Sequence, residues 1–317
     1  MNKVAIIGCG NIGQRHMRNA STLFPEATIY AIRSGGGNTS CPAEADQLIG
    51  IGQLDASYSL AIVASPATLH IKHAQHCLNM DIPTLIEKPL SHDYVTAKHF
   101  VRGLKQSSSA IAGVAYCLRY LPSAQFIKSL LETEQLGQIY NVNVEVGQYL
   151  PDWRSGVDYT QSVSARSELG GGALNELSHE IDYMNWLFGI DKILSASTRR
   201  SQELSTNVEE IVDAQLKLKN NAVASLHLDF LQKHPHRKCI IVAEHARIEW
   251  DLITNSVTQL SAKGVQTIFD GLGYNKNQMY LDMLKDFIIE KRHTVNLNEG
   301  LEVLHIIQRI RESARNV

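Results

Sequence analysis

A glycine-rich turn near the start of the chain constrains its fold more than any other feature. The apolar run VAII at residues 4–7 leads into GCGNIG at residues 8–13, and a stretch with helical periodicity follows. In a strand–turn–helix context, the three glycines allow a sharp turn, leave room for a pyrophosphate, and let the helix pack close to the strand. The helix start also presents unpaired N–H groups to phosphates. The sequence therefore predicts a dinucleotide site that includes Gly8, Gly10, Asn11, Ile12 and Gly13.

The remainder of the first third of the chain alternates short apolar runs with helical segments. Apolar runs at residues 28–32, 60–64, 84–86 and 110–114 are typical of strands in a parallel sheet that is covered on both faces. Helices are expected at residues 69–80 and 91–105, the second capped by Ser91. The pattern predicts a doubly wound Rossmann domain at residues 1–118.

The pattern changes after residue 118, where we expect a second α/β domain at residues 119–317. A helix at 123–133 precedes an alternating strand around Val142, Val144 and Val146, and a helix at 173–188 ends at Gly189. Alternation resumes at 212–218 and 222–230 around an Asn-Asn turn, and short strands are expected at 239–243 and 247–251. This domain should contain a large, mostly antiparallel open sheet. Helices at 275–291 and 298–313 close the chain and are able to pack back on the first domain.

Composition excludes several classes of function. The 317 residues carry 30 Lys and Arg against 32 Asp and Glu, a net charge of −2, which gives no electrostatic basis for binding nucleic acid or a membrane. The five cysteines are scattered without C-x-x-C spacing, so neither a disulfide framework nor a metal site is expected. No apolar run is long enough for a membrane helix, and no leader-like segment precedes the first strand. We expect a cytoplasmic protein.

The end of the second strand bears on the choice of cofactor. An NAD-binding domain usually places Asp or Glu there, about twenty residues after the glycines, to bind the adenine ribose. This chain has Arg33 and Ser34 at that point. A guanidinium and a hydroxyl suit a ribose phosphate, so we predict NADP rather than NAD. The alternative is that Arg33 is a solvated loop residue.

Two further segments carry candidate catalytic residues. Glu87-Lys88-Pro89 directly follows the fourth strand, at the sheet edge where open α/β folds bind ligands, and Lys88 is suited to polarise a substrate oxygen there. In the helix at 173–188, helical spacing places Asn175, His179, Asp182 and Trp186 on one stripe. His179 is suited to move a proton near neutral pH, and Asp182 to orient it. Leu177, Ile181, Met184 and Phe188 form the opposite, apolar stripe.

These three elements together resemble the glucose–fructose oxidoreductase / inositol dehydrogenase (Gfo/Idh/MocA) family. The resemblance runs through the whole chain and includes the SPATLH segment at residues 65–70. It implies that the first domain binds NAD(P), that Lys88 hydrogen-bonds the reacting hydroxyl, that His179 is the acid/base, and that the peptide before Pro89 is cis. It places Ser65, Pro66, His70 and Glu87 beside the cofactor, and Glu176 near the substrate. Many members have Asp where this chain has Asn175, which is expected to contact a substrate hydroxyl without supplying charge.

A loop of about twenty residues, 149–168, is long enough to suggest a function. With the segment around the proposed acid/base, it resembles a branch of the family associated with bacterial surface-polysaccharide and nonulosonic-acid sugars. Trp153 and Tyr159 offer flat surfaces to a sugar, and Arg154 and Arg166, joined by Arg119, offer charge to an anionic one. The alternatives are a surface excursion or a subunit contact.

The sequence thus predicts an oxidoreductase that transfers hydride between NADP(H) and a secondary alcohol or ketone of a sugar or sugar derivative. Two other functions stay open: an NAD-dependent glycoside-cleaving enzyme of the same fold, and a catalytically silent sensor that binds NADP. By resemblance, the second-domain sheet is expected to form a homodimer or homotetramer through its outer positions, which include Gln215, Ser225 and His227.

Overall fold

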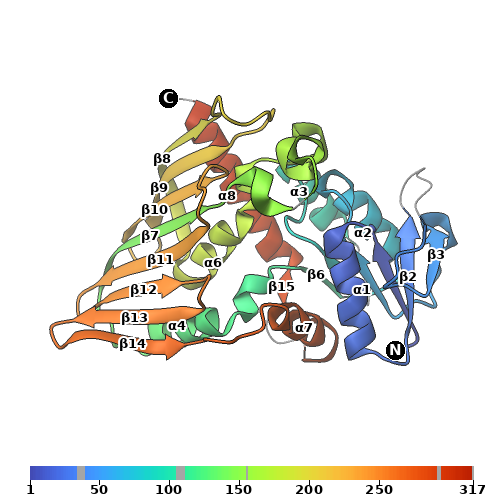
Figure 1. Cartoon of the computed structure of the whole chain (residues 1–317), viewed down its shortest axis with the longest axis horizontal. Coiled ribbons are helices and arrows are strands. Elements are labelled where there is room, and N and C mark those ends of the chain that lie inside the picture. Colours follow the sequence, from blue (N-terminus) through green and yellow to red (C-terminus); the bar gives the residue numbers. More distant parts are fainter. Residues whose placement is uncertain (34–39, 105–110, 155, 291–293, 316–317) are drawn as a thin grey trace. The chain divides into compact units, whose positions relative to one another are not determined.

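The first compact unit of this computed structural model contains a sheet of parallel strands in the order β6-β5-β4-β1-β2-β3 (Figure 1). Strand β15 pairs with β6 in the antiparallel direction at one edge of this sheet. The structure describes residues 1–33, 40–104, 111–154, 156–290 and 294–315. The first unit comprises Met1–Tyr116 and Met279–Leu304. Its strands are β1 (Lys3–Ile7), β2 (Thr28–Arg33), β3 (Gln47–Gly50), β4 (Leu60–Val63), β5 (Thr84–Ile86), β6 (Ala112–Val114) and β15 (Val295–Asn296).

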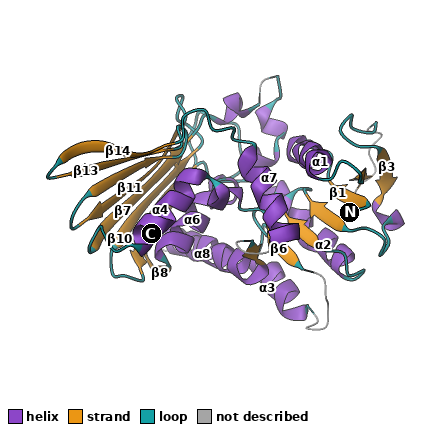
Figure 2. Ribbon diagram, turned by 90° about the horizontal axis from the view of Figure 1, so that it is seen from below, coloured by secondary structure: helices purple, strands orange, loops and turns teal. Residues whose placement is uncertain are grey.

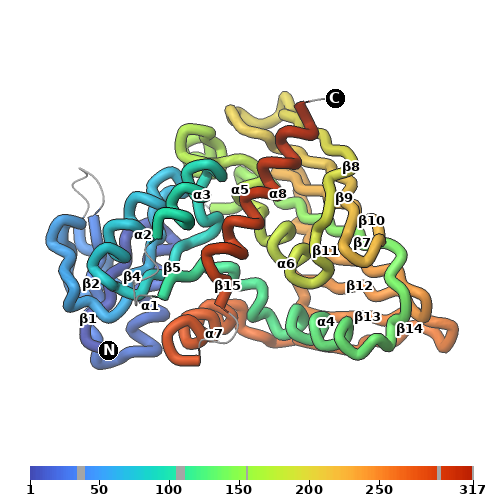
Figure 3. The backbone as a smooth tube through the Cα atoms, turned by 180° about the vertical axis from the view of Figure 1, so that it is seen from behind, coloured from blue at the N-terminus to red at the C-terminus, as the bar shows by residue number. Residues whose placement is uncertain are grey.

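The central strands of this sheet form the core because both faces are covered. All residues of β4 and all but the first of β1 are buried. Helix α1 (Asn11–Leu23) lies on one face, and α2 (His70–Leu78) and α3 (Tyr94–Gly103) lie side by side on the other (Figures 2 and 3). The chain therefore winds in opposite directions from β1 and from β4, and the crevice beyond their carboxyl ends is the position where such sheets bind ligands.

The second unit, Cys117–Gln278 with His305–Val317, contains the sheet β14-β13-β12-β11-β7-β10-β9-β8. Only the β7–β10 pair is parallel among the described strand pairs, so the predicted mostly antiparallel sheet is confirmed. Val142, Val144 and Val146 are buried, as the alternation predicts. The strands are β7 (Ile139–Gly147), β8 (Ile190–Arg199), β9 (Ile211–Leu218), β10 (Val223–Asp229), β11 (His236–Ala243), β12 (Arg247–Asp251), β13 (Ser256–Ser261) and β14 (Gly264–Asp270).

Helices cover one face of this second sheet. Helices α4 (Pro122–Glu132) and α6 (Ser178–Phe188) lie against it, and within the described chain the opposite face carries no helix (Figure 2). Short α5 (Ala173–Glu176) precedes α6. Helix α7 (Gln278–Lys285) runs into a π-helical turn at Asp286–Glu290, and α8 (Leu297–Arg315) ends the described chain.

The structure corrects several boundaries. Helix α3 begins at Tyr94, and Asp93, not Ser91, is its cap, because the Asp93 carboxylate accepts a hydrogen bond from Thr96 N at 2.7 Å. The far end of that predicted helix (105), the start of the strand at 110 and the end of the helix at 291 lie outside the described residues. None of the described helices is both long and apolar enough to cross a membrane.

Candidate functional site

The glycine-rich turn has the geometry that a pyrophosphate requires. A Cβ at Gly13 would lie 1.9 Å from Gly8 O, and a Cβ at Gly8, where φ is +114°, would lie 2.5 Å from Ala64 O. Both positions therefore need glycine for close packing. A Cβ at Gly10 would meet nothing within 4 Å, so this glycine faces open space beside the start of α1. The turn thus fits a dinucleotide, with Gly10, Asn11 and Ile12 at the helix N-terminus.

Arg33 ends β2 beside this turn. Gly8 N donates to Ile32 O at 3.3 Å, so the end of β2, where Arg33 lies, is held next to the turn. Burial raises the pKa of the Cys9 thiol inside the turn, and the positive charge of Arg33 acts in the opposite direction. Ser34, the other residue predicted to select NADP, lies outside the described residues.

The loop after β4 lies next to the glycine turn and is held by two buried histidines. His70, only 2% exposed, lies with Nε2 2.7 Å from Ser65 O. His73 places Nδ1 2.8 Å from Ser65 Oγ, and burial lowers the pKa of His73 to about 4, so this ring is neutral at neutral pH. The predicted cofactor residue His70 therefore uses its ring on the main chain, and His73 was not predicted at all.

The Glu87-Lys88-Pro89 turn follows β5 at the same sheet edge. The Lys88–Pro89 peptide is cis, as the family resemblance implies. Glu87 is buried and lies 2.7 Å from Nε2 of His16, a fully buried residue of α1 that the sequence did not single out. Burial acts to raise the pKa of Glu87, but the hydrogen bond and charge of His16, together with the charges of Lys88 and His70, outweigh it and hold that pKa below its ordinary value. Lys88 itself is half-buried.

The helix that carries His179 is not continuous. Leu177 has φ −100° and ψ 28°, which separates α5 from α6, so Asn175 does not share a continuous helix with the rest of its predicted stripe. His179, Asp182 and Trp186 all lie in α6, at the spacing predicted for one stripe. His179 is the second residue of α6 and is half-buried. All four residues of the predicted apolar stripe are buried, but Leu177 lies at the break, so only Ile181, Met184 and Phe188 share α6.

Two ion pairs with buried carboxylates anchor α6 just after His179. Arg119 donates to both oxygens of Asp182, at 3.1 and 2.8 Å, and Arg237 of β11 donates to both oxygens of Glu180, at 2.6 and 3.0 Å. Arg119 is only 5% exposed, and its guanidinium also lies over the Trp186 ring. The substrate contact predicted for Arg119 is therefore corrected to an internal ion pair. The orientation of His179 by Asp182 stays a prediction.

Asn175 supports the backbone of the glycine segment that precedes α5. Its amide Nδ2 donates to Gly170 O at 2.9 Å, and the side chain is buried. Gly170 and Gly172 have φ of +85° and +106°, so this segment needs glycine. An aspartate at 175 would bring carboxylate oxygens against a carbonyl oxygen, which explains why asparagine suits this chain. Glu176 accepts a hydrogen bond from Ser164 Oγ at 3.0 Å.

The 149–168 loop is held by hydrogen bonds within the loop and to neighbouring segments, including Asn207 and Glu176. Trp153 donates to Gln148 O at 3.1 Å, and Arg166 donates to Thr160 O at 2.9 Å and pairs with Glu168. Arg154 is exposed. In this structure Trp153 and Arg166 stabilise the loop, and their contact with a substrate stays a prediction, as does that of Arg154.

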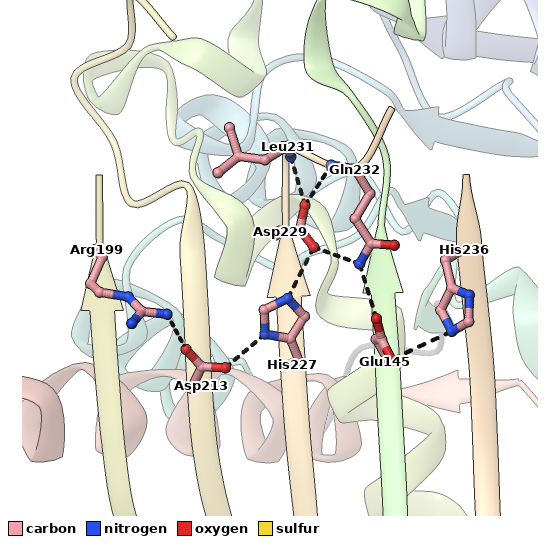
Figure 4. Close-up of polar contacts among 8 residues, drawn as sticks. All are labelled: Glu145, Arg199, Asp213, His227, Asp229, Leu231, Gln232 and His236. Carbon is pink, nitrogen blue, oxygen red and sulfur yellow. Dashed lines mark hydrogen bonds and ion pairs between the residues drawn. The ribbon is translucent and has the colours of Figure 1, made fainter. Parts of the chain in front are cut away.

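A chain of polar contacts crosses the face of the second sheet that lacks helices (Figure 4). His227 on β10 lies 2.7 Å from Asp213 and 3.0 Å from Asp229. The hydrogen bond to Asp229 is the largest influence that raises the pKa of His227 to about 9, with Asp213 adding to it against partial desolvation. The contacts continue outward from this triad to Arg199 on one side and to Gln232, Glu145 and His236 on the other.

Comparison with known proteins agrees with this architecture. Residues 2–116 match the model for an oxidoreductase family with an NAD-binding Rossmann fold, and residues 124–249 match the Gfo/Idh/MocA C-terminal domain. Oxidoreductase P35 of Formosa agariphila is 22% identical over 95% of this chain and 96% of that protein. Glucose-6-phosphate 3-dehydrogenase of Bacillus subtilis is 28% identical over 68% of this chain and 61% of that protein.

A solved structure shares the fold over nearly the whole length. Levoglucosan dehydrogenase in complex with NADH superimposes with a TM-score of 0.85 at 18% identity, covering 99% of this chain and 97% of that one. The Rossmann-fold model matches the first part of the chain and the C-terminal-domain model matches the part that follows. The glycine turn has the geometry for a dinucleotide. This chain belongs to the Gfo/Idh/MocA family and is an oxidoreductase with an NAD-binding Rossmann domain.

Proposed function

We propose that this chain transfers a hydride between NADP(H) and a secondary alcohol or ketone of a sugar or sugar derivative. The observation that carries the proposal is the convergence, at one sheet edge of the first unit, of the glycine turn, the Ser65 loop and the turn that bears Lys88. The substrate class is supported by the names of the relatives, which include glucose-6-phosphate 3-dehydrogenase and inositol 2-dehydrogenase.

In this proposal two side chains act on the reacting oxygen. When bound, the nicotinamide would supply the hydride acceptor or donor. Lys88 donates a hydrogen bond to the reacting oxygen and favours the negative charge that develops there. His179 takes the hydroxyl proton when the alcohol is oxidised and returns a proton to that oxygen in the reverse direction.

A turnover screen tests the function. Glucose 6-phosphate, levoglucosan, myo-inositol and UDP-N-acetylglucosamine would each be offered with NAD and NADP, and reduced nicotinamide measured by absorbance. We expect net reduction with at least one sugar. Glycoside cleavage without net cofactor reduction would favour the glycosidase alternative, and binding of cofactor without any turnover would favour the sensor.

Variants test the two proposed catalytic groups. Lys88→Ala and His179→Ala should each lower kcat by roughly 10²–10⁴, the range for loss of a positioned acid or base. Lys98→Ala on α3 and His245→Ala on the surface are the matched controls and should leave kcat unchanged. A normal kcat in a folded Lys88 or His179 variant would contradict its role.

The preference for NADP rests on Arg33. Arg33 ends β2 next to the glycine turn, since Gly8 N donates to Ile32 O at 3.3 Å, and from that position a guanidinium could neutralise a ribose phosphate. Arg33→Asp should weaken NADPH binding much more than NADH binding. Lys72→Asp makes an equal charge change at an exposed residue of α2 and should alter the binding of neither cofactor. Tighter binding of NADH than of NADPH by the unaltered protein would refute the preference.

We also propose that copies of this chain associate through the helix-free face of the second sheet. That face bears hydrogen-bonded polar side chains, such as the Gln215–Ser225 pair, and a shallow depression of about 460 Å³. Ser225→Arg should shift the sedimentation coefficient toward that of a monomer, while Asn220→Arg in the β9–β10 turn should not. A monomeric unaltered protein at micromolar concentration would exclude this association.

A further inference from the structure

Lys88 lies on a turn that buried histidines hold from two sides. On one side, His16 of α1 lies 2.7 Å from the Glu87 carboxylate, whose other oxygen accepts a hydrogen bond from Lys88 N at 3.1 Å. On the other side, Nδ1 of His70 lies 2.8 Å from Pro89 O. The residues immediately before and after Lys88 are thus fixed by side chains from two different helices of the first unit.

His70 connects this turn to the loop after the neighbouring strand. Its second nitrogen, Nε2, lies 2.7 Å from Ser65 O, so one ring spans from the loop after β4 to the turn after β5. Two carbonyl oxygens can only accept, and a neutral imidazole has a single N–H, so full bonding on both sides requires both nitrogens to be protonated. Burial is the largest influence and holds the pKa of His70 below its ordinary value, against the opposite effect of the two carbonyls and the Glu87 carboxylate, so near neutral pH the ring donates to one of the two carbonyls at a time.

We propose that His70 is a positioning residue for the reaction: its bridge between Ser65 O and Pro89 O fixes the backbone from which Lys88 reaches the substrate. This inference rests on the role proposed above for Lys88. It assigns His70 a task different from the cofactor contact predicted from sequence, since both ring nitrogens face the protein main chain. Displacement of a catalytic group by about 1 Å can cost 10²-fold in rate, so loss of the bridge should act on kcat.

The test replaces His70 with phenylalanine, which keeps a flat buried ring and removes both hydrogen bonds. The matched control is His76→Phe, because His76 lies on the same helix and contacts a main-chain carbonyl, Ile51 O at 3.1 Å, far along the chain from Lys88. Using the fastest sugar of the screen, His70→Phe should lower kcat by about 10- to 100-fold while KM and the cofactor Kd change little. His76→Phe should leave all three unchanged. His70→Gln, which retains an amide donor, should recover part of the rate.

A second readout needs no turnover. In the protein without substrate, an amine-reactive reagent would be used to label lysines, and labelling of Lys88 would be quantified by mass spectrometry relative to half-buried Lys98 of α3. His70→Phe should change the ratio of Lys88 to Lys98, and His76→Phe should not. An unchanged ratio in the folded His70 variants would overturn the proposal.

A double variant separates the two proposals. In the Lys88→Ala background, His70→Phe should have little further effect on kcat, because the group that it positions is already absent. If Lys88→Ala alone has normal kcat, the proposed function of Lys88 fails. If Lys88→Ala lowers kcat but His70→Phe has normal kcat, only the positioning role fails. The same holds if the fold-losses in kcat of the two single variants multiply fully in the double variant. Failure of both His70→Phe and His70→Gln to fold would assign the bridge to global stability and also overturn it.

Discussion

Replacement of single glycines in the turn separates packing from cofactor binding. A Cβ at Gly13 would lie 1.9 Å from Gly8 O, while ordinary contact begins at 3.4 Å, so α1 would have to move by about 1.5 Å. The helix cannot move freely, because Met17 and Ala20 are fully buried against the sheet and His16 is bonded to Glu87.

The expected loss of stability follows from two opposing effects. Overpacking costs about 1–3 kcal/mol and occasionally more, and a clash with backbone belongs at the upper end. Alanine in a helix gains up to about 1 kcal/mol over glycine. Gly13→Ala should therefore destabilise the first unit by about 2 kcal/mol, which corresponds to roughly 4–8 °C in Tm for a unit of this size.

Gly10→Ala provides the matched comparison. Gly10 has φ −73°, which alanine adopts without strain, and its Cβ would point into open space. We expect a stability change below about 1 kcal/mol, the usual scale for a helix N-cap. The added methyl occupies space that the pyrophosphate needs, so the cofactor Kd should rise at least about tenfold, or 1.4 kcal/mol.

The assays are urea-induced unfolding and fluorescence titration with NADPH and NADH. We expect Gly13→Ala to lower the free energy of unfolding. We expect Gly10→Ala to leave that free energy nearly unchanged and to weaken cofactor binding. A Gly13→Ala protein as stable as the unaltered chain would refute the packing argument. Unchanged cofactor affinity in Gly10→Ala would refute the location of the pyrophosphate.

Three further predictions address the second unit. Arg119→Met leaves the Asp182 carboxylate buried without its arginine and should cost about 3–5 kcal/mol in urea unfolding; a loss below 1 kcal/mol would contradict an anchoring role. Arg154→Ala should raise KM for a charged sugar by about tenfold and leave KM for a neutral sugar unchanged, as loss of one charge-assisted contact predicts. Arg166→Ala should change KM for both sugars equally, because Arg166 holds the loop. The reverse pattern would exchange the roles of the two arginines. Because the pKa of His227 rises to about 9 on folding, its stabilisation is complete below its ordinary pKa of 6.5 and is lost as pH rises through 9. The stability difference between unaltered protein and His227→Gln, measured by urea unfolding, should therefore vanish above that pH; a constant difference from pH 6 to 10 would contradict the charged state.

The strands that could be predicted are those whose burial leaves a clear pattern in the sequence, either a continuous apolar run or a strict alternation such as that of Val142, Val144 and Val146. Strands β1 and β4 read as continuous apolar runs because helices cover both faces of their sheet. Strands β3 and β14 escaped prediction because they lie at sheet edges and remain partly or largely exposed; Val265 of β14 is 72% exposed. At a sheet edge, a strand can be held by backbone pairing with its one neighbour while its side chains stay exposed, so no hydrophobic pattern in the sequence indicates it.

The candidate site divides in a similar way. Gly8 and Lys88 could be located from sequence because each lies within two residues of the end of a buried strand, and the carboxyl ends of parallel strands share one edge. Gly13 could be located because it completes the glycine motif at the start of α1. The side chains that hydrogen-bond to these segments could not be located from sequence. His16 and Glu87 are separated by 71 positions, and a single histidine within a helix carries no periodic or motif signal that names its partner.

The helix around His179 shows why residue type and spacing alone assign roles poorly. Glu180 and Asp182 have the chemistry of catalytic carboxylates and the right distance along the chain, yet each accepts two hydrogen bonds from a buried or half-buried arginine. Each carboxylate thus neutralises a charge that would otherwise be costly to bury. His179, which directly precedes Glu180, is half-buried, so the same local sequence supplies two anchors and one partly exposed titratable group. Only the tertiary position of Arg119 and Arg237, which the sequence leaves open, distinguishes the anchors from the candidate acid/base.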